Sequence, residues 1–256
     1  MPASVTGLST APVKGMRVSA VESIELDERG ARGDRAFFII DADGRLVNGK
    51  RLGDLQAIVP EFQPAANVLA LRFPGGESAS AALRYGNMLV TRFHSRALPA
   101  REVHGPWSDA LSTFAGRPLR LVASETAIDR GPGGTVSIIS RGSLRRLAEA
   151  AQTDAVDARR FRMLIEIDGV AAHGEDDWVG RRIAIGPSLV AVNGHVGRCV
   201  VTTRDPDTGI VGFPTLRLLA TYRREVDSTE PLAFGIYGGV LQGGTVRLGD
   251  RVALAG

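Results

Sequence analysis

The residue in this chain best suited to bind a metal or to attack an electrophile is its single cysteine, Cys199. Arg198 precedes it, and a cation beside a thiol favours the thiolate, the form that does both. The surrounding residues predict a strand over 189–203. A turn is predicted at 205–209, because its proline presets φ and its glycine tolerates positive φ. Free cysteines are most often small buried hydrophobes, and these residues alone favour that interpretation over a functional one.

Cationic side chains that could bind an anion stand at two expected turns. Of the 31 lysines and arginines only two are lysines, Lys14 and Lys50, and Arg51 follows the second. Because lysine and arginine are not interchangeable at an anion site, the two lysines are candidates for positions that need a compact ammonium. A coding bias towards arginine, with two ordinary surface lysines, explains the same pattern.

A second candidate anion site is the start of a helix predicted over 141–151. Ser140 has the type and position of an N-cap, and Thr135 and Ser137 add hydroxyls just before it. The free N–H groups of a helix N-terminus bind anions. An ordinary capped helix would show the same residues, so the sequence leaves both interpretations open.

Several common kinds of catalytic or nucleotide-binding site find no match. The sequence contains no P-loop, no dinucleotide-binding glycine motif and no nucleophile elbow. Its four histidines lack the short helical spacing of zinc sites. On an ideal strand His195 would lie about 13 Å from Cys199, too far for a hydrogen bond unless the strand breaks at a glycine. Cysteine hydrolase chemistry is therefore not expected.

The composition argues against some classes of function and location. The net charge is +3 and the pI about 9.5, but basic residues are dispersed among carboxylates and aromatic residues make up only 5%. We therefore expect no nucleic-acid partner. No apolar run approaches the roughly 18 residues that span a bilayer, and the first residues lack a signal-peptide pattern, so we expect no membrane association. A single cysteine excludes an internal disulfide and fits a reducing cytoplasm.

Turns punctuate the chain at short intervals, and the apolar pattern between them is mostly that of strands. Helices are predicted at 107–114, 141–151 and 216–224. The small residues of 75–82 indicate a loop, and the acidic, glycine-rich segment 125–134 indicates a linker that borders a cleft. A β-rich α+β fold follows. The main predicted strands are 5–12, 20–26, 35–41, 67–73, 87–93, 118–124, 163–167, 181–185, 233–241 and 247–254.

Taken together, these residues resemble the MOSC family, named after the C-terminal part of molybdenum-cofactor sulfurase. The first half resembles the family's N-terminal β-barrel region through Pro12-Val13-Lys14, Gly33-Asp34-Arg35 and Asp43-Gly44. The second half resembles the MOSC domain proper through Phe161-Arg162, Glu175-Asp176-x-Trp178, Arg198-Cys199 with its Asp-Pro-Asp-Thr-Gly turn, Phe234-Gly235-Ile236-Tyr237 and Gly249-Asp250. The resemblance implies an N-terminal β-barrel-like region over 1–105, packed on a MOSC β-barrel domain over 118–256.

The resemblance also implies roles for individual residues. Cys199 matches the thiolate that ligates molybdenum in the amidoxime-reducing branch of the family, and Tyr237 matches a tyrosine near the cofactor, so both are expected to be catalytic. Met163-Leu164 replace the Pro-Asn of that branch, which removes a polar group near the metal. Lys14, Lys50, Arg162 and Arg198 match positions that bind the pterin cofactor or its phosphate in the family. Arg51, beside Lys50, and the hydroxyls of Thr135 and Ser137 before the predicted helix are expected to add to the same site on the strength of their chemistry.

The activity implied by the resemblance is that of a molybdenum-cofactor oxidoreductase that reduces N-hydroxylated small molecules. No cysteine-rich segment for an iron–sulfur cluster is present, so electrons are expected from a separate flavin, haem or iron–sulfur protein. Two alternatives stay open. One is a carrier that holds sulfur as a Cys199 persulfide or holds the cofactor for transfer, and the other is a β-rich binding module in which Cys199 is inert.

Overall fold

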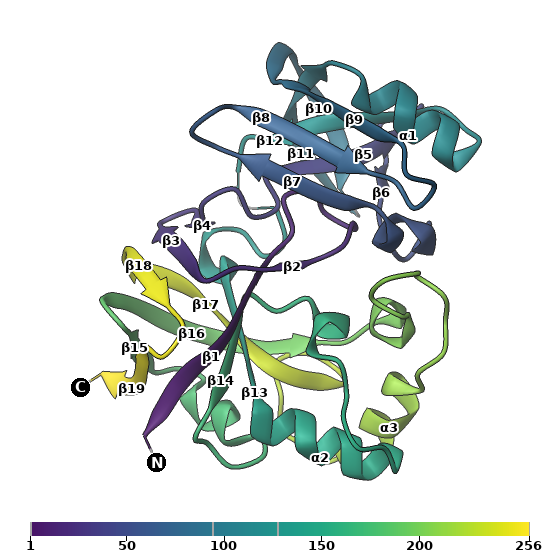
Figure 1. Cartoon of the computed structure of the whole chain (residues 1–256). Helices are drawn as coiled ribbons and strands as arrows, with labels where there is room; N and C mark the ends of the chain where they lie inside the picture. Colours follow the sequence, from purple (N-terminus) through teal and green to yellow (C-terminus); the bar gives the residue numbers. More distant parts are fainter. Residues whose placement is uncertain (1, 94, 127, 256) are drawn as a thin grey trace.

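Two β-rich units make up the chain, one built mainly from residues 37–124 and the other from the N-terminal strand and residues 136–255 (Figure 1). The computed structural model describes residues 2–93, 95–126 and 128–255. In Figure 1 the blue and teal strands of the first unit lie above the green and yellow strands of the second. The purple strand at the N-terminus runs along the second unit.

A closed barrel forms the second unit. Its ring closes because strand β1 (Ala3–Thr10) pairs on one side with β14 (Ile165–Asp168) and on the other with β19 (Arg251–Ala255). Alternate side chains such as Ile183 and Ile185 point inward and are fully buried, as the period of two requires. A further short strand, β2 (Ser19–Ala20), pairs with the end of β1. Around the ring the order is β14 (Ile165–Asp168), β13 (Val136–Ser140), β17 (Ala233–Gln242), β16 (Ser188–Gly197), β15 (Arg182–Ile185), β19 (Arg251–Ala255) and β1 (Ala3–Thr10).

Within the described residues, the first unit contains two antiparallel sheets and one α-helix. The larger sheet has the order β10 (Arg84–Phe93), β11 (Arg96–His104), β12 (Leu119–Ser124), β5 (Phe37–Asp41) and β6 (Leu46–Val47). A β-bridge between Arg45 and Arg92 joins its two edges, which makes it barrel-like. The smaller sheet contains β7 (Val59–Gln63), β8 (Val68–Arg72) and β9 (Ser78–Ala82). Helix α1 (Trp107–Ala115) is anchored by Trp107, which is fully buried and whose Nε1 donates to the carbonyl of Leu69 at 3.1 Å.

Strand pairings link the two halves of the sequence in both directions. From the N-terminal half, β1 lies in the barrel, and β3 (Ser23–Asp27) pairs with both β4 (Gly30–Ala31) and β18 (Gly244–Arg247). Conversely, β12 pairs with β5 of the first unit. The predicted division into domains at 1–105 and 118–256 stays a prediction. Several strand pairings join residues from its two sides.

Short helices complete the fold. Helix α2 (Arg141–Ala151) packs beside α3 (Thr215–Tyr222) on the barrel. No helix in the described ranges is long and apolar enough to cross a membrane. The predicted β-rich α+β architecture, with barrels and a few short helices, is confirmed. Five 3-10 helices lie within the described residues: η1 (Gly53–Ala57), η2 (Pro132–Gly134), η3 (Ala158–Phe161), η4 (Gly174–Trp178) and η5 (Val200–Thr203).

The structure corrects the strand predicted over 189–203. Strand β16 ends at Gly197, whose N–H donates to Glu230 Oε2 at 2.9 Å. The chain then forms η5, in which the N–H of Thr202 donates to the carbonyl of Cys199 at 3.0 Å. The strand therefore ends before Cys199, where the carboxylate of Glu230 takes the N–H of Gly197.

Other local predictions also fail where tertiary pairing outweighs sequence preference. The segment 75–82, predicted as a loop, contains β9, which pairs with β8 over its whole length and buries Ala79 in the core. Small residues have little intrinsic β-propensity but fit a close-packed sheet. The strand predicted over 247–254 is divided between β18 and β19 by a turn in which Gly249 has a φ of 86°. Strands β7 and β11 were not predicted.

The helix N-terminus considered as an anion site already holds a carboxylate of the chain itself. Ser140 caps α2 by accepting from the N–H of Ser143 at 3.0 Å. The fully buried Glu175 accepts from the N–H of Ser140 at 3.1 Å, from Ser140 Oγ at 2.8 Å and from Ser143 Oγ at 2.7 Å. Burial raises the pKa of Glu175, although these hydrogen bonds oppose the rise. This end of α2 is thus an ordinary capped helix.

Replacing Glu175 by alanine should lower the free energy of unfolding by about 2–4 kcal/mol, because three buried donors lose their acceptor and a cavity remains. Glu175→Gln keeps the shape and one carbonyl oxygen, so it should cost less. Urea denaturation followed by tryptophan fluorescence measures both. An unchanged unfolding midpoint in Glu175→Ala would contradict this role.

Candidate functional site

A cavity of about 740 Å³ lies between the two units and takes its wall from both. The lining residues fall within segments 14–15, 27–36, 48–50, 124–137, 160–163 and 196–202, with Glu230 added. Among the lining residues that the structure describes, nine are cationic and four are acidic. The field of this wall therefore favours an anion.

The structure brings together seven of the nine residues predicted from the sequence to form the site. The other two do not reach the cavity wall. The Arg51 guanidinium is held on the first unit by Asp41 Oδ2 at 2.9 Å and by the carbonyl of Leu46 at 3.1 Å. The Tyr237 ring lies behind the wall, where the guanidinium carbon of Arg130 is 4.8 Å from its centroid. The seven residues that line the cavity are Lys14, Lys50, Thr135, Ser137, Arg162, Arg198 and Cys199, and their roles stay predictions.

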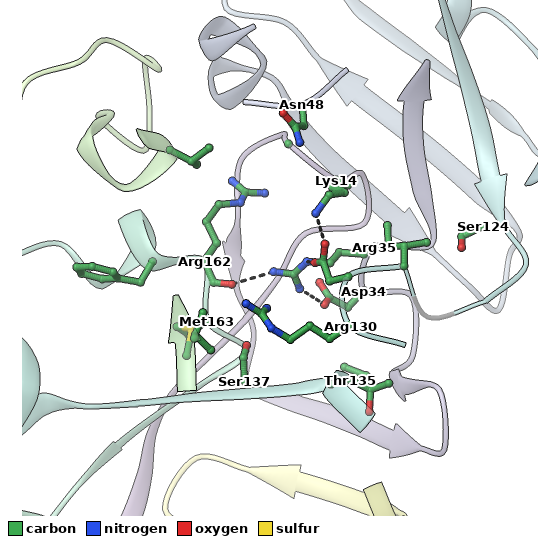
Figure 2. A pocket seen from close by; sticks show the side chains of 18 of the residues that line it. Lys14, Asp34, Arg35, Asn48, Ser124, Arg130, Thr135, Ser137, Arg162 and Met163 are labelled. Atoms are coloured by element: carbon green, nitrogen blue, oxygen red, sulfur yellow. Dashed lines mark hydrogen bonds and ion pairs between the residues drawn. The ribbon is translucent and has the colours of Figure 1, made fainter. Parts of the chain in front are cut away.

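A network of ion pairs surrounds Lys14, in the turn that follows β1 (Figure 2). The Lys14 ammonium pairs with Asp129 Oδ1, and Arg35 Nε lies 2.9 Å from Asp129 Oδ2. Arg35 also pairs with Asp34 through Nη1. Burial lowers the pKa of Lys14, and the nearby cations Arg35 and Arg162 lower it further, against the opposing effect of Asp129. Burial alone would raise the pKa of Asp129, but Lys14 and Arg35 hold it far below its usual range.

Arg162 carries the least compensated charge of this network. It ends η3 with a left-handed φ of 55°, and its carbonyl accepts from Arg35 Nη2 at 2.8 Å (Figure 2). Its own Nη2 is buried without a hydrogen-bond partner among the described residues. Burial, with repulsion from Arg35, lowers the pKa of Arg162 to about 10. The side chain is therefore still cationic at neutral pH and has a donor to offer an anion.

Two hydroxyls and a second ammonium add donors to the same cavity. Thr135 Oγ1 is buried and has no hydrogen-bond partner within the described part of the chain. Ser137 Oγ accepts from the N–H of Leu164 at 3.0 Å, so its hydroxyl proton can be donated to a ligand. Lys50 is exposed at the cavity rim, where its N–H donates to Asn48 Oδ1 at 3.0 Å. Together these groups suit a ligand with several acceptor oxygens.

Cys199 reaches the cavity from the N-terminal end of η5. Its carbonyl accepts from the N–H and from Oγ1 of Thr202, both at 3.0 Å. The thiol is free, and the residue is half-buried rather than sealed in a core. A half-buried thiol on a cavity wall can reach a ligand, whereas an inert core cysteine cannot.

The half-buried Arg198 places a positive charge next to this thiol. Its Nε donates to the carbonyl of Phe234 at 2.8 Å and its Nη1 to the carbonyl of Phe161 at 3.0 Å. Burial lowers the pKa of Arg198 to about 9, with a further lowering by Arg130 and an opposing effect of Cys199. Because backbone carbonyls accept hydrogen bonds without neutralising the guanidinium, Arg198 keeps its positive charge at the cavity wall.

An ion pair that the sequence did not reveal fixes the backbone just before Cys199. Arg130 donates to both carboxylate oxygens of Glu230, from Nε at 3.2 Å and from Nη2 at 3.1 Å. Glu230 Oε2 also accepts from the N–H of Gly197. The acidic segment 125–134 indicated a cleft but not this partner, because a contact across 100 residues leaves no local signal. Arg35 could have been found from its Gly-Asp-Arg motif.

The predicted turn after Cys199 ties three segments together. Asp207 accepts bidentate hydrogen bonds from Arg159, whose Nη1 and Nη2 each lie 2.8 Å from one of its carboxylate oxygens. Arg17, three residues after Lys14, pairs with Asp207 Oδ1 at 3.2 Å and donates to the Asp207 carbonyl at 2.6 Å. Hydrogen bonds from Arg159 and the charge of both arginines lower the pKa of Asp207. The turn thus links the Cys199 segment to the Lys14 and Arg162 segments.

The other groups near Cys199 in the sequence point elsewhere. His195 Nδ1 accepts from the N–H of Thr229 at 3.3 Å, and its Nε2 lies 3.9 Å from Asp176 Oδ1. His195 is not part of the cavity lining. No cluster of three or more His, Cys, Asp or Glu that could hold a metal occurs in the described ranges. A metal at Cys199 would therefore need further ligands from outside this set.

Replacing Asp207 by asparagine should loosen the Cys199 segment, because one formal charge of the Arg159 and Arg17 pairing is lost. We expect several-fold faster alkylation of Cys199 by iodoacetamide and a lower melting temperature. Asp43→Asn is the matched control, since Asp43 forms an exposed pair with Arg45 at 3.6 Å. Equal alkylation rates in wild type and Asp207→Asn would contradict the role of the turn.

The chain is similar in sequence or in structure to several known proteins. The relatives include mitochondrial amidoxime-reducing component 1 of Xenopus laevis, 26% identical over 97% of this chain and 81% of the relative. Molybdenum cofactor sulfurase 2 of Aedes aegypti is 24% identical over 80% of this chain but only 26% of the sulfurase. The solved structure of the YUAD protein from Bacillus subtilis matches 98% of this chain and 94% of its own, at 11% identity and a TM-score of 0.46.

Two family models match the chain. The model of the MOSC N-terminal beta barrel domain matches residues 2–114, and the model of the MOSC domain matches residues 125–253. The two matches together span almost the whole chain, and so this protein belongs to the MOSC family.

Proposed function

We propose that this protein binds a molybdenum cofactor and reduces N-hydroxylated small molecules. The observation that carries the proposal is one cavity lined by the chain's only thiol, Cys199, and by Arg162, whose buried Nη2 has no hydrogen-bond partner among the described residues. A pterin cofactor has a phosphate that needs cations and a metal that takes a soft ligand. The relatives named as amidoxime-reducing components and as molybdenum cofactor sulfurases support the same cofactor.

The residues present fit such a group. Arg162 Nη2 and Thr135 Oγ1 are buried donors without partners in the described structure, and Lys14 lies in the same network. These donors would hold the phosphate and the pterin. Cys199 would ligate the metal, with Arg198 beside it to stabilise the thiolate. Because the chain offers one soft ligand here, the other metal ligands would come from the cofactor and solvent.

The bound cofactor would supply the two-electron chemistry that cleaves an N–O bond. The chain's own residues bind and orient the substrate. Phe161, Met163 and Val196 line the cavity as an apolar part of its wall, which excludes water and suits the apolar body of a small organic substrate. Met163 and Leu164 stand where the amidoxime-reducing branch has Pro-Asn. Of these two residues, Met163 lines the cavity, whereas Leu164 is buried in the barrel core. Electrons would come from a separate donor protein.

A sulfur or cofactor carrier is the second candidate. The half-buried free thiol of Cys199 and the sulfurase relatives favour it. In this case Cys199 would carry a persulfide, or would hold the cofactor for transfer without turnover. A persulfide on Cys199 in mass spectra of the purified protein, with no reductase activity from any electron donor, would support the carrier and contradict the reductase.

Replacing Cys199 by serine should remove most of the molybdenum, because the chain loses its soft metal ligand. The protein is expressed in a host that makes the cofactor, and the metal content is measured by mass spectrometry on wild type and variant. We expect near-stoichiometric molybdenum in the wild type. Low molybdenum that is the same in both proteins would contradict the proposal.

Replacing Arg162 by glutamine should lower the pterin content several-fold, because the phosphate loses a buried cation. Arg51→Gln is the matched control, since the Arg51 guanidinium is tied to Asp41 outside the cavity wall. Pterin released by denaturation is oxidised and measured by fluorescence. Equal pterin content in Arg162→Gln and Arg51→Gln would contradict the assignment of Arg162.

A further inference from the structure

Each of the three guanidinium nitrogens of Arg35 already has a partner in the chain. Its Nη1 pairs with Asp34, its Nη2 donates to the carbonyl of Arg162 at 2.8 Å, and its Nε lies 2.9 Å from Asp129 Oδ2 (Figure 2). The other oxygen of Asp129 pairs with Lys14. Asp129 therefore bridges two of the cations that line this part of the cavity, Lys14 and Arg35.

The two carboxylates of this network differ in how firmly the fold holds them. Asp34 Oδ1 also accepts from the N–H of Ala11 at 2.7 Å, and its side chain is only 8% exposed. Asp34 thus belongs to the framework. Asp129 lies in the connection between β12 and β13, its side chain is 28% exposed, and the partners of its carboxylate are the side chains of Lys14 and Arg35. Of the two, Asp129 is the one that can leave.

The third cation shows what the network lacks. Within the described residues, Arg162 Nη2 is buried without a hydrogen-bond partner, whereas Lys14 and Arg35 share Asp129. Lys14, Arg35 and Arg162 thus share the charge of two carboxylates, Asp34 and Asp129, and one positive charge of the three is in surplus. A ligand with two negative charges and several oxygens would neutralise this surplus better than one carboxylate.

We propose that the Asp129 carboxylate is an internal anion that occupies the position of a ligand phosphate between Lys14 and Arg35, and that a bound phosphate must displace it. The identity of the phosphate as that of the pterin cofactor rests on the proposed function. The phosphate would take the Asp129 contacts on Lys14 and Arg35 and add the free donor of Arg162. Asp129 keeps the cations compensated before the ligand binds, at a cost in affinity for the ligand.

The test measures inorganic phosphate binding to the cofactor-free protein by isothermal titration at fixed ionic strength. We expect Asp129→Asn to bind phosphate about tenfold more tightly than wild type or better, because the competing charge is gone. Arg162→Gln should bind much more weakly. Asp43→Asn removes one carboxylate from an exposed pair outside the cavity lining and should bind as wild type does. Wild-type binding with no gain in Asp129→Asn would overturn the displacement and leave the proposed function standing. No phosphate binding in either protein would overturn both.

A second measurement avoids the chance that the Asp129 variant does not fold. Crystals of the cofactor-free wild type are soaked in phosphate and compared with unsoaked crystals. We expect phosphate oxygens in contact with Lys14 and Arg162, and the Asp129 carboxylate turned away from Lys14. Phosphate bound to Arg162 while Asp129 still bridges Lys14 and Arg35 would show that the two anions coexist, and would overturn the proposal.

Discussion

Everything at this site depends on positive charge that the fold keeps buried in the cavity wall. A buried cation costs free energy unless hydrogen bonds and counter-charges replace its water. Arg198 receives them from backbone carbonyls, and Lys14 receives them from Asp129. Of the described cations in the lining, only Arg162 has a buried nitrogen without a hydrogen bond. The wall is therefore preorganised for an anion and incompletely compensated without one.

The path of the chain explains why this charge gathers between two units. Strand β1 closes the barrel, and the turn that follows it carries Lys14 to the first unit, where its N–H donates to the carbonyl of Phe37. After β12 the chain returns to the barrel and brings Asp129 and Arg130 across the cavity. The turn at Asp207 connects the Cys199 segment to Arg17, close to Lys14, and to Arg159, close to Arg162. Neither unit alone could build this wall.

The sequence predicted the parts of the site whose signal is local. The β-rich class, the cap at Ser140 and the turn after Cys199 follow from patterns within a few residues, and seven of nine candidate site residues line one cavity. The partners of those residues were not predictable from the sequence. Asp129 pairs with Lys14, and Glu230 with Arg130, only because the fold brings distant parts of the chain together. The end of β16 was missed for the same reason, since a distant carboxylate takes the N–H of Gly197. Arg51 carried the right charge, but Asp41 holds it away from the cavity.

The most direct test of the central claim is to locate the metal and the phosphate in crystals of the cofactor-loaded protein by anomalous diffraction at the molybdenum absorption edge. The account predicts a molybdenum peak at bonding distance from Cys199 Sγ, with the pterin phosphate in contact with Arg162 and Lys14. A molybdenum peak remote from Cys199, or a loaded protein in which the thiol is unligated and Arg162 still lacks an anion, would contradict it.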